Sequence, residues 1–270
     1  MLFEIVPNLS EGRSAETIAA AVAAVNATGA RVLDWSSDAV HHRSVLTIVG
    51  DGDQVLAGAL ALTGIALERI DLQRHAGVHP RIGALDVLPF VPLEGATLRD
   101  AARLAHEAGA AIWEQYGIPS LYYGAAARAP ERFLLPAIRS NLDWMPDEGD
   151  ILRHHSAGAI AIGARDILIA FNIELATADL TAARRIARAI RERDGGFRTL
   201  RALALPREDR VQVSLNITNY AATPLYRIVE LVRDLAAQLN VELVGCELIG
   251  CLPLAAVEAT AAYYLGVTKL

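Results

Sequence analysis

Histidine is the side chain best suited to acid–base chemistry near neutral pH, and six of the seven histidines of this chain fall in three short segments. The three segments carry His41 and His42, His75 and His79, and His154 and His155. The middle segment reads His-Ala-Gly-Val-His-Pro-Arg, and its glycine and proline argue against a continuous helix. We therefore expect a helix to end around His75, and His79 to project from a rigid loop before the next strand, where a catalytic group is well placed.

The histidines also allow a metal-dependent alternative. Two histidines four residues apart would be zinc ligands on one face of a helix, although Gly77 and Pro80 disfavour that helix. A metal-dependent hydrolase would draw its ligands from His41, His42, His75 and His79. Such an enzyme would lose its activity to a chelator.

The composition is that of a folded protein, with 53% hydrophobic and 21% charged residues. A formal net charge of −6 argues against a nucleic-acid partner or an anionic membrane surface, because both attract basic proteins. Cys246 and Cys251 are too few for a disulfide framework and form no CxxC pair, so we expect them to be reduced and buried. Neither a signal peptide nor a membrane span is predicted, and the cytoplasm is the expected location.

The first 165 residues predict a βαββαβ unit. Strands are expected at 2–6, 32–33, 45–49 and 85–91, and helices from Ser14 to Gly29 and from the turn at 50–53 to about Arg74. Pro89 and Pro92 predict that the last of these strands is short or lies at a sheet edge. Thr97 with Asp100 resembles a capping box for a further helix that ends at Gly117, followed by a strand at 120–123.

A comparable pattern returns after residue 165. Strands are expected at 167–173, 200–205, 211–217 and 242–249, and helices at 180–193, 224–240 and from about Pro253. Thr223 is the expected N-cap of the second helix, with Pro224 at its first position. The arginines at 184–193 fit the solvated face of an amphipathic helix.

These elements predict an α+β fold of the α/β-sandwich type. We expect two ferredoxin-like βαββαβ subdomains, residues 1–165 and 166–270, with a substrate cleft between them. A doubly wound α/β fold is the rival. Strand pairs without an intervening helix, at 32–49 and 200–217, argue against it, as does the lack of a GxGxxG motif after the first strand.

Short motifs in a fixed order along nearly the whole chain point to one family. They are VPNLSEG at 6–12, HRSV at 42–45, HAGVHPRIGALDV at 75–87, GAR at 163–165, LIAFNI at 168–173, QVSLN at 212–216 and ELIG at 247–250. Each motif is weak alone, but together they resemble the formiminotransferase family, including the transferase part of formiminotransferase-cyclodeaminase. The resemblance implies a two-subdomain transferase, usually a homodimer, that uses tetrahydrofolate as co-substrate and no metal.

The resemblance also implies which residues act. The catalytic histidine of the family precedes Pro-Arg, and the matching residue here is His79. The folate contacts of the family lie around the segment that matches 154–172, which contains Gly158, Ala159 and Asn172. His42, in a matched motif, is a further candidate for substrate binding.

Three arginines are candidates to bind the two carboxylates of a glutamate substrate. Arg43, Arg81 and Arg165 all lie in matched motifs, and the guanidinium fork suits a carboxylate. Each of them could instead form a structural ion pair. The chain departs from the animal members of the family at two positions: Val78 replaces a glutamate, and Ser36 falls about where they carry an acidic residue. Asp38 is the nearest substitute and a candidate to orient His79.

The expected reaction moves the formimino group of N-formimino-L-glutamate to tetrahydrofolate, giving 5-formiminotetrahydrofolate and L-glutamate in histidine degradation and one-carbon metabolism. His79 would carry the proton, because an imidazole pKa of about 6.5 suits both directions of transfer. A 5-formyltetrahydrofolate cyclo-ligase-like enzyme on the same scaffold is an alternative, although no P-loop for ATP is present. A folate-binding protein without activity is a third alternative.

Overall fold

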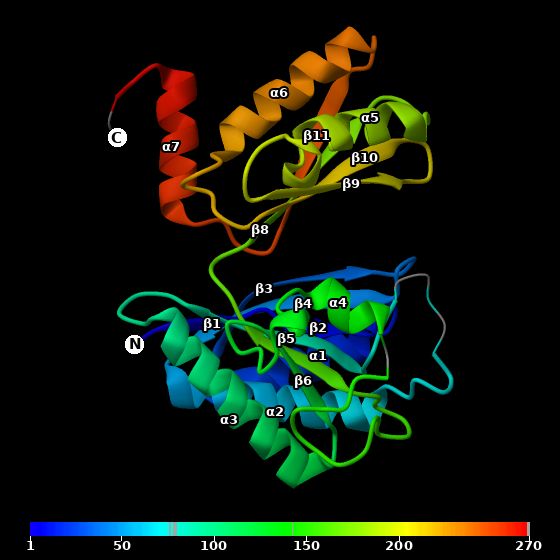
Figure 1. The fold of residues 1–270 in the computed structure, drawn as a ribbon, viewed down its shortest axis with the longest axis vertical. Helices are drawn as coiled ribbons and strands as arrows, with labels where there is room; N and C mark the ends of the chain where they lie inside the picture. The colour runs from blue at the N-terminus through cyan, green and yellow to red at the C-terminus, as the bar shows by residue number, and fades with distance from the viewer. Residues whose placement is uncertain (76, 78–79, 142, 269–270) are drawn as a thin grey trace. The chain divides into compact units, whose positions relative to one another are not determined.

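The computed structural model describes residues 1–75, 77, 80–141 and 143–268, and the chain divides into two compact units, Met1–Asp166 and Ile167–Leu270 (Figure 1). Each unit has its own sheet and its own hydrophobic core. Among the described residues, none of the helices combines the length and the apolar character that a membrane span requires.

The first unit is built on a mixed sheet. Its strands are β1 (Phe3–Ile5), β2 (Asn8–Leu9), β3 (Arg31–Asp38), β4 (Arg43–Gly50), β5 (Leu85–Pro92), β6 (Ser120–Gly124) and β7 (Ile160–Ala164). β1 and β2 share one position between β4 and β5 and pair antiparallel with both, while β3 pairs with β4 at the edge. β7 and then β6 continue the sheet beyond β5 in parallel. The first four positions are therefore the predicted ferredoxin-like unit, extended by two strands.

Helices cover both faces of this sheet. α1 (Ala15–Asn26), α2 (Gly52–Arg69) and α3 (Leu98–Tyr116) lie side by side on one face and bury their aliphatic side chains there (Figure 1). The predicted caps are present, since Ser14 caps α1 and Thr97 forms a capping box with Asp100 at α3. A short turn, η1 (Pro130–Arg132), and α4 (Leu135–Ser140) follow β6, and Ile138 of α4 packs on the other face.

Two local predictions in this unit were wrong, and one strand was missed. α2 ends at Arg69 and not at about Arg74, because Ile70 adopts an extended backbone and is buried in the core. His75 therefore does not lie in the last turn of a helix. β5 is an interior strand despite its prolines. Pro89 lies opposite the break between β1 and β2, and its carbonyl accepts the Val6 N–H at 3.3 Å. The strand β7 was not predicted.

The second unit confirms the predicted ferredoxin-like pattern. β8 (Ile169–Leu175), β9 (Leu200–Pro206), β10 (Val211–Ile217) and β11 (Leu243–Ile249) form an antiparallel sheet in the order β11-β8-β10-β9. α5 (Leu180–Ile190) and α6 (Leu225–Gln238) cover one face (Figure 1). A turn, η2 (Glu192–Asp194), follows α5, and α7 (Leu254–Leu265) packs beside α6.

Two predictions for the second unit need correction. The Thr223 side chain does not cap α6, because its hydroxyl donates to the Arg198 carbonyl at 2.5 Å and Pro224 occupies the N-cap position. Cys246 and Cys251 are exposed and not buried. The arginine-rich helix behaves as predicted: Ile186 and Ile190 of α5 enter the core, while its arginines stay outside.

Candidate active site

The loop that follows α2 is attached at both ends to one segment of the chain, residues 156–159. The Leu72 N–H donates to the Ser156 carbonyl at 2.8 Å, and the Ala84 N–H donates to the Ala157 carbonyl at 2.9 Å. The backbone is therefore fixed to this segment on both sides of residues 75–81, the first part of the central motif. His79, the predicted proton carrier, lies outside the described residues, so its role stays a prediction.

Gly158 and Ala159, which we expected to contact folate, belong to this attachment. Gly158 has a φ angle of +72°, and a Cβ atom there would lie 2.2 Å from the Ile82 carbonyl oxygen. Gly83 forms an isolated bridge with Gly158, and its Cβ would lie 2.0 Å from the Ala159 carbonyl oxygen. Glycine fits both positions because the two backbones approach so closely. The small residues thus serve backbone packing here, and folate binding stays a prediction for them.

Two of the candidate site histidines, His42 and His75, stack on each other beside Glu11. The ring centroids of His42 and His75 lie 3.7 Å apart, with an interplanar angle of 36°. The Gly12 N–H donates to His42 Nδ1 at 3.0 Å, and the Arg81 guanidinium donates to His75 Nδ1. Burial lowers the pKa of both histidines, to about 4 for His75, and the positive charge of Arg81 adds to this effect. Both imidazoles are therefore mainly neutral at pH 7.

Glu11, His42 and His75 are a group of described residues that could hold a metal ion, because one ligand atom of each lies within 4.8 Å of the others. Two imidazoles and a carboxylate are a donor set that suits zinc. In this arrangement, however, both Nδ1 atoms accept N–H hydrogen bonds, and the positive charge of Arg81 lies against His75. A metal ion would have to displace these donors, so the geometry does not favour the metal-dependent hydrolase.

Asp38, the candidate to orient His79, closes the turn between β3 and β4. Its Oδ1 accepts the Val40 and His41 N–H groups at 2.8 Å, and its Oδ2 lies 2.7 Å from His41 Nδ1. Burial alone would raise the pKa of Asp38, but the hydrogen bonds from His41 hold it below its ordinary value. Asp38 therefore stabilises the turn that presents His42, and a role toward His79 stays a prediction.

Asp86 is a fully buried carboxylate in β5 that two arginines share. Arg43 Nη1 and Arg139 Nη2 both donate to Asp86 Oδ2 at 2.6 Å, and the Ile82 N–H donates to Oδ1 at 2.7 Å. Arg43 also donates through Nε and Nη2 to Asn8 Oδ1, at 3.0 and 2.7 Å. The predicted substrate ligand Arg43 is thus held in a buried ion pair, and Asp86 also fixes the backbone just after the central loop.

Arg165 follows β7 in the same unit. Its Nη1 donates to the Asp166 carbonyl at 2.9 Å. Burial raises the pKa of Tyr123 and the pKa of Glu4, and the nearby Arg165 charge opposes both rises. These contacts are structural, and carboxylate binding by Arg165 stays a prediction.

Asn172 belongs to the second unit, where it lies in β8. Its Nδ2 donates at 3.0 Å to Oε2 of Glu247, the cross-strand neighbour in β11. This pair orients the amide, and the structure does not test its proposed contact with a pterin.

Sequence reasoning missed two of the three residues of this ion-pair group, the carboxylate Asp86 and its second arginine, Arg139. Asp86 carries a recognisable signal, because it is a lone carboxylate in an otherwise apolar strand, where a charge needs a partner. Arg139 carries no such signal, since it lies outside every matched motif.

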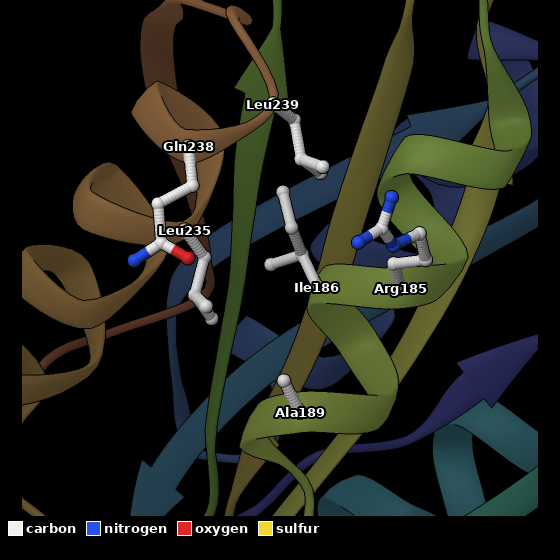
Figure 2. Close-up of a pocket in the computed structure, with 6 residues that line it drawn as sticks. All are labelled: Arg185, Ile186, Ala189, Leu235, Gln238 and Leu239. Carbon is white, nitrogen blue, oxygen red and sulfur yellow. The ribbon is translucent and has the colours of Figure 1, made fainter.

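A separate hollow lies in the second unit between α5 and α6 (Figure 2). Arg185, Ile186 and Ala189 line it from α5, and Leu235, Gln238 and Leu239 line it from α6 and its end. Its volume is about 120 Å³, well below the roughly 300 Å³ of small-molecule sites. None of its residues belongs to a matched motif, so we do not place substrate binding there.

Comparison with known proteins identifies relatives over the whole chain. Residues 2–165 match the family model of the formiminotransferase domain, N-terminal subdomain, and residues 170–270 match that of the formiminotransferase domain. The chain is 39% identical to the glutamate formimidoyltransferase of Streptococcus pyogenes serotype M1, over 98% of this chain and 94% of the relative. It is 41% identical to the glutamate formimidoyltransferase of Thermoplasma acidophilum, over 98% and 92%. A formimidoyltransferase-cyclodeaminase of Rattus norvegicus is 36% identical over all of this chain and 53% of the relative.

Proposed function

Because the chain belongs to the formiminotransferase family, we propose that it is a glutamate formimidoyltransferase, a one-carbon transferase. The observation that carries this proposal is the near full-length match to two relatives of that name. The donor is then N-formimino-L-glutamate, the acceptor is tetrahydrofolate, and the products are 5-formiminotetrahydrofolate and L-glutamate. Both substrates are small molecules.

The reaction needs a group that carries one proton between two nitrogens. The N5 amine of tetrahydrofolate forms a bond to the formimino carbon and loses a proton. The bond from that carbon to the glutamate nitrogen then breaks, and this nitrogen gains a proton. Such general acid–base catalysis contributes about 10² to 10⁴-fold, and alignment of the two substrates supplies the remainder.

We assign the proton transfer to His79. Two other histidines of the matched motifs, His42 and His75, are poor carriers. Their Nδ1 atoms act as acceptors, and their pKa values are lowered, to about 4 for His75. A general base works best when its pKa lies near the working pH. The anchors at Leu72 and Ala84 support this assignment, since they fix the two ends of the loop that contains His79.

Arg81 is our first candidate for a carboxylate of the donor. It is two residues from His79, and one of its guanidinium nitrogens contacts His75. Arg43 already donates hydrogen bonds from Nε, Nη1 and Nη2 to Asn8 and Asp86. We therefore assign Arg43 to positioning Asp86 and not to binding the substrate.

Replacement of His79 by Ala tests the proposal. We expect turnover to fall at least about a hundredfold, since general acid–base catalysis is lost, with folate binding and the melting temperature largely retained. The measurement is formation of 5-formiminotetrahydrofolate and glutamate without ATP. His106→Gln, on α3, is the control and should turn over normally. A His79→Ala enzyme with near-normal turnover removes His79 from the mechanism, and a wild-type enzyme that requires ATP and 5-formyltetrahydrofolate points to the cyclo-ligase.

Our proposal extends to a homodimer in the cytoplasm and to tetrahydrofolate as a co-substrate that is bound only during the reaction. The family resemblance implies the homodimer and the co-substrate, and the cytoplasm is the location expected from the sequence. Light scattering on the purified protein measures the mass of the assembly, and a monomeric mass contradicts the homodimer.

A further inference from the structure

The charges around Asp86 are not balanced. Arg43 and Arg139 both donate to its single carboxylate, and Arg81 is close enough to interact with it electrostatically. Among the described residues, Arg43 and Arg139 pair with this one carboxylate, which balances only one of the two guanidinium charges. Glu11, the carboxylate on the His42 side, lies 3.4 Å from His42 Nδ1, and no ion pair joins it to Arg43 or Arg139 among the described residues. The cluster is therefore suited to an anion from outside the chain.

The two arginines on Asp86 differ in how many of their donors are used. Arg43 donates through all three of its guanidinium nitrogens. Arg139 donates one hydrogen bond among the described residues, from Nη2 to Asp86, and its buried Nε has no partner there. About a fifth of its side chain is exposed, at 22%, whereas Asp86 is fully buried. Arg139 is thus anchored at one nitrogen and retains donors for a second acceptor.

We propose that Arg139 binds a carboxylate of the glutamate moiety of the formimino donor, with Asp86 as the residue that positions its guanidinium. This inference rests on the proposed function, because the donor of that reaction is a dicarboxylate. One carboxylate of the donor would balance the charge that Arg43 and Arg139 hold in excess of Asp86. The planar guanidinium also matches a carboxylate in geometry, and a lysine at the same place would not.

Arg139→Gln in the full-length protein is the direct test, because it removes the charge and leaves Asp86 paired with Arg43. Arg132→Gln is a matched control. Arg132 precedes α4 in the same connection and also has a buried Nε without a described partner, but Asp147 balances its charge at 2.7 Å. Arg139→Lys is the second variant. It keeps the positive charge but loses the planar guanidinium with its paired N–H donors.

Binding of L-glutamate, the product, is measured by calorimetry and needs no turnover. We expect Arg139→Gln to weaken it about 10- to 100-fold and Arg139→Lys to weaken it less, while Arg132→Gln binds as the wild type does. The KM for the formimino donor should rise by a similar factor with an unchanged KM for tetrahydrofolate. A donor in which this carboxylate is replaced by an amide should have a higher KM than the normal donor in the wild type. In Arg139→Gln the two donors should have similar KM values.

Unchanged glutamate binding in a folded Arg139→Gln protein, shown by its melting curve, overturns the inference. A rise confined to the KM for tetrahydrofolate also overturns it, because the bound carboxylate would then belong to the folate tail. Glutamate binding that depends on Arg139 in a protein without formimino transfer would instead contradict the proposed function alone. Normal formimino transfer, together with Arg139 variants that bind glutamate as the wild type does, would contradict this inference alone.

Discussion

At the scale of single residues, Asp86 is the group that connects the described parts of the site. Burial of a carboxylate costs several kcal/mol unless charges and hydrogen bonds offset it. Burial would raise the pKa of Asp86, but Arg43, Arg139 and the Ile82 N–H together hold it below its ordinary value. Asp86 therefore stays ionised near neutral pH and joins β4, β5 and α4 through its partners.

Replacement of Asp86 by Asn should destabilise the protein by about 3–5 kcal/mol at pH 7, because two partly buried guanidiniums lose their counter-charge. A lowered folded pKa stabilises the folded state fully above the ordinary carboxyl pKa of about 3.9, and this stabilisation disappears as the pH falls through the folded value. The difference between the two proteins should therefore shrink in acid. Urea unfolding at several pH values measures it, with the exposed Asp209→Asn as control. A difference that does not change with pH contradicts this account of Asp86.

At the scale of elements, the site depends on a backbone contact between the start of β5 and the turn before β7. The segments 82–84 and 157–159 hydrogen-bond to each other and approach at Gly83 and Gly158 without room for a Cβ. Because the loop after α2 is tied to the same turn through Leu72, this contact sets the position of both loop ends.

Replacement of Gly158 by Ala should therefore destabilise the protein by about 3 kcal/mol or more, since the new Cβ adds a clash to backbone strain. Gly117→Ala is the matched control. Gly117 caps α3 with a similar φ of +63°, but its Cβ would meet nothing within 4 Å, so we expect only the strain of about 1–2 kcal/mol. Denaturant unfolding compares the two variants. Equal losses of stability would show that Gly158 is present for its backbone angle, or for a ligand, and not for this close contact.

At the scale of the whole molecule, the chain contains two units that each bury a separate core. The second unit is a complete ferredoxin-like βαββαβ fold, in which α5 and α6 cover one face of four antiparallel strands. Its size is typical of a domain that folds on its own.

We accordingly expect a fragment of residues 167–270 to fold alone. Thermal or urea unfolding should show one cooperative transition with a free energy of about 5–15 kcal/mol. Ile228→Ala, at a fully buried position of α6, should lower that value by about 2–5 kcal/mol, while the exposed Leu203→Ala should leave it almost unchanged. A fragment without a cooperative transition would mean that the second unit needs the first for its stability.

The sequence by itself determined the elements and the family. Alternating and helical patterns predicted most of the strands and helices, and glycine, proline and capping residues marked many of their ends, because these signals act between near neighbours in the chain. The order of the matched motifs then indicated the family, and with it the expected role of His79.

The tertiary structure alone decided which charges meet. Arg43 and Arg139 lie 43 and 53 positions from Asp86, and no local pattern relates residues so far apart. The end of α2 was decided in the same way, since Ile70 leaves the helix to fill the core. Where a buried carboxylate must find partners, the partners come from whichever elements the fold brings beside it, and here α4 contributes Arg139.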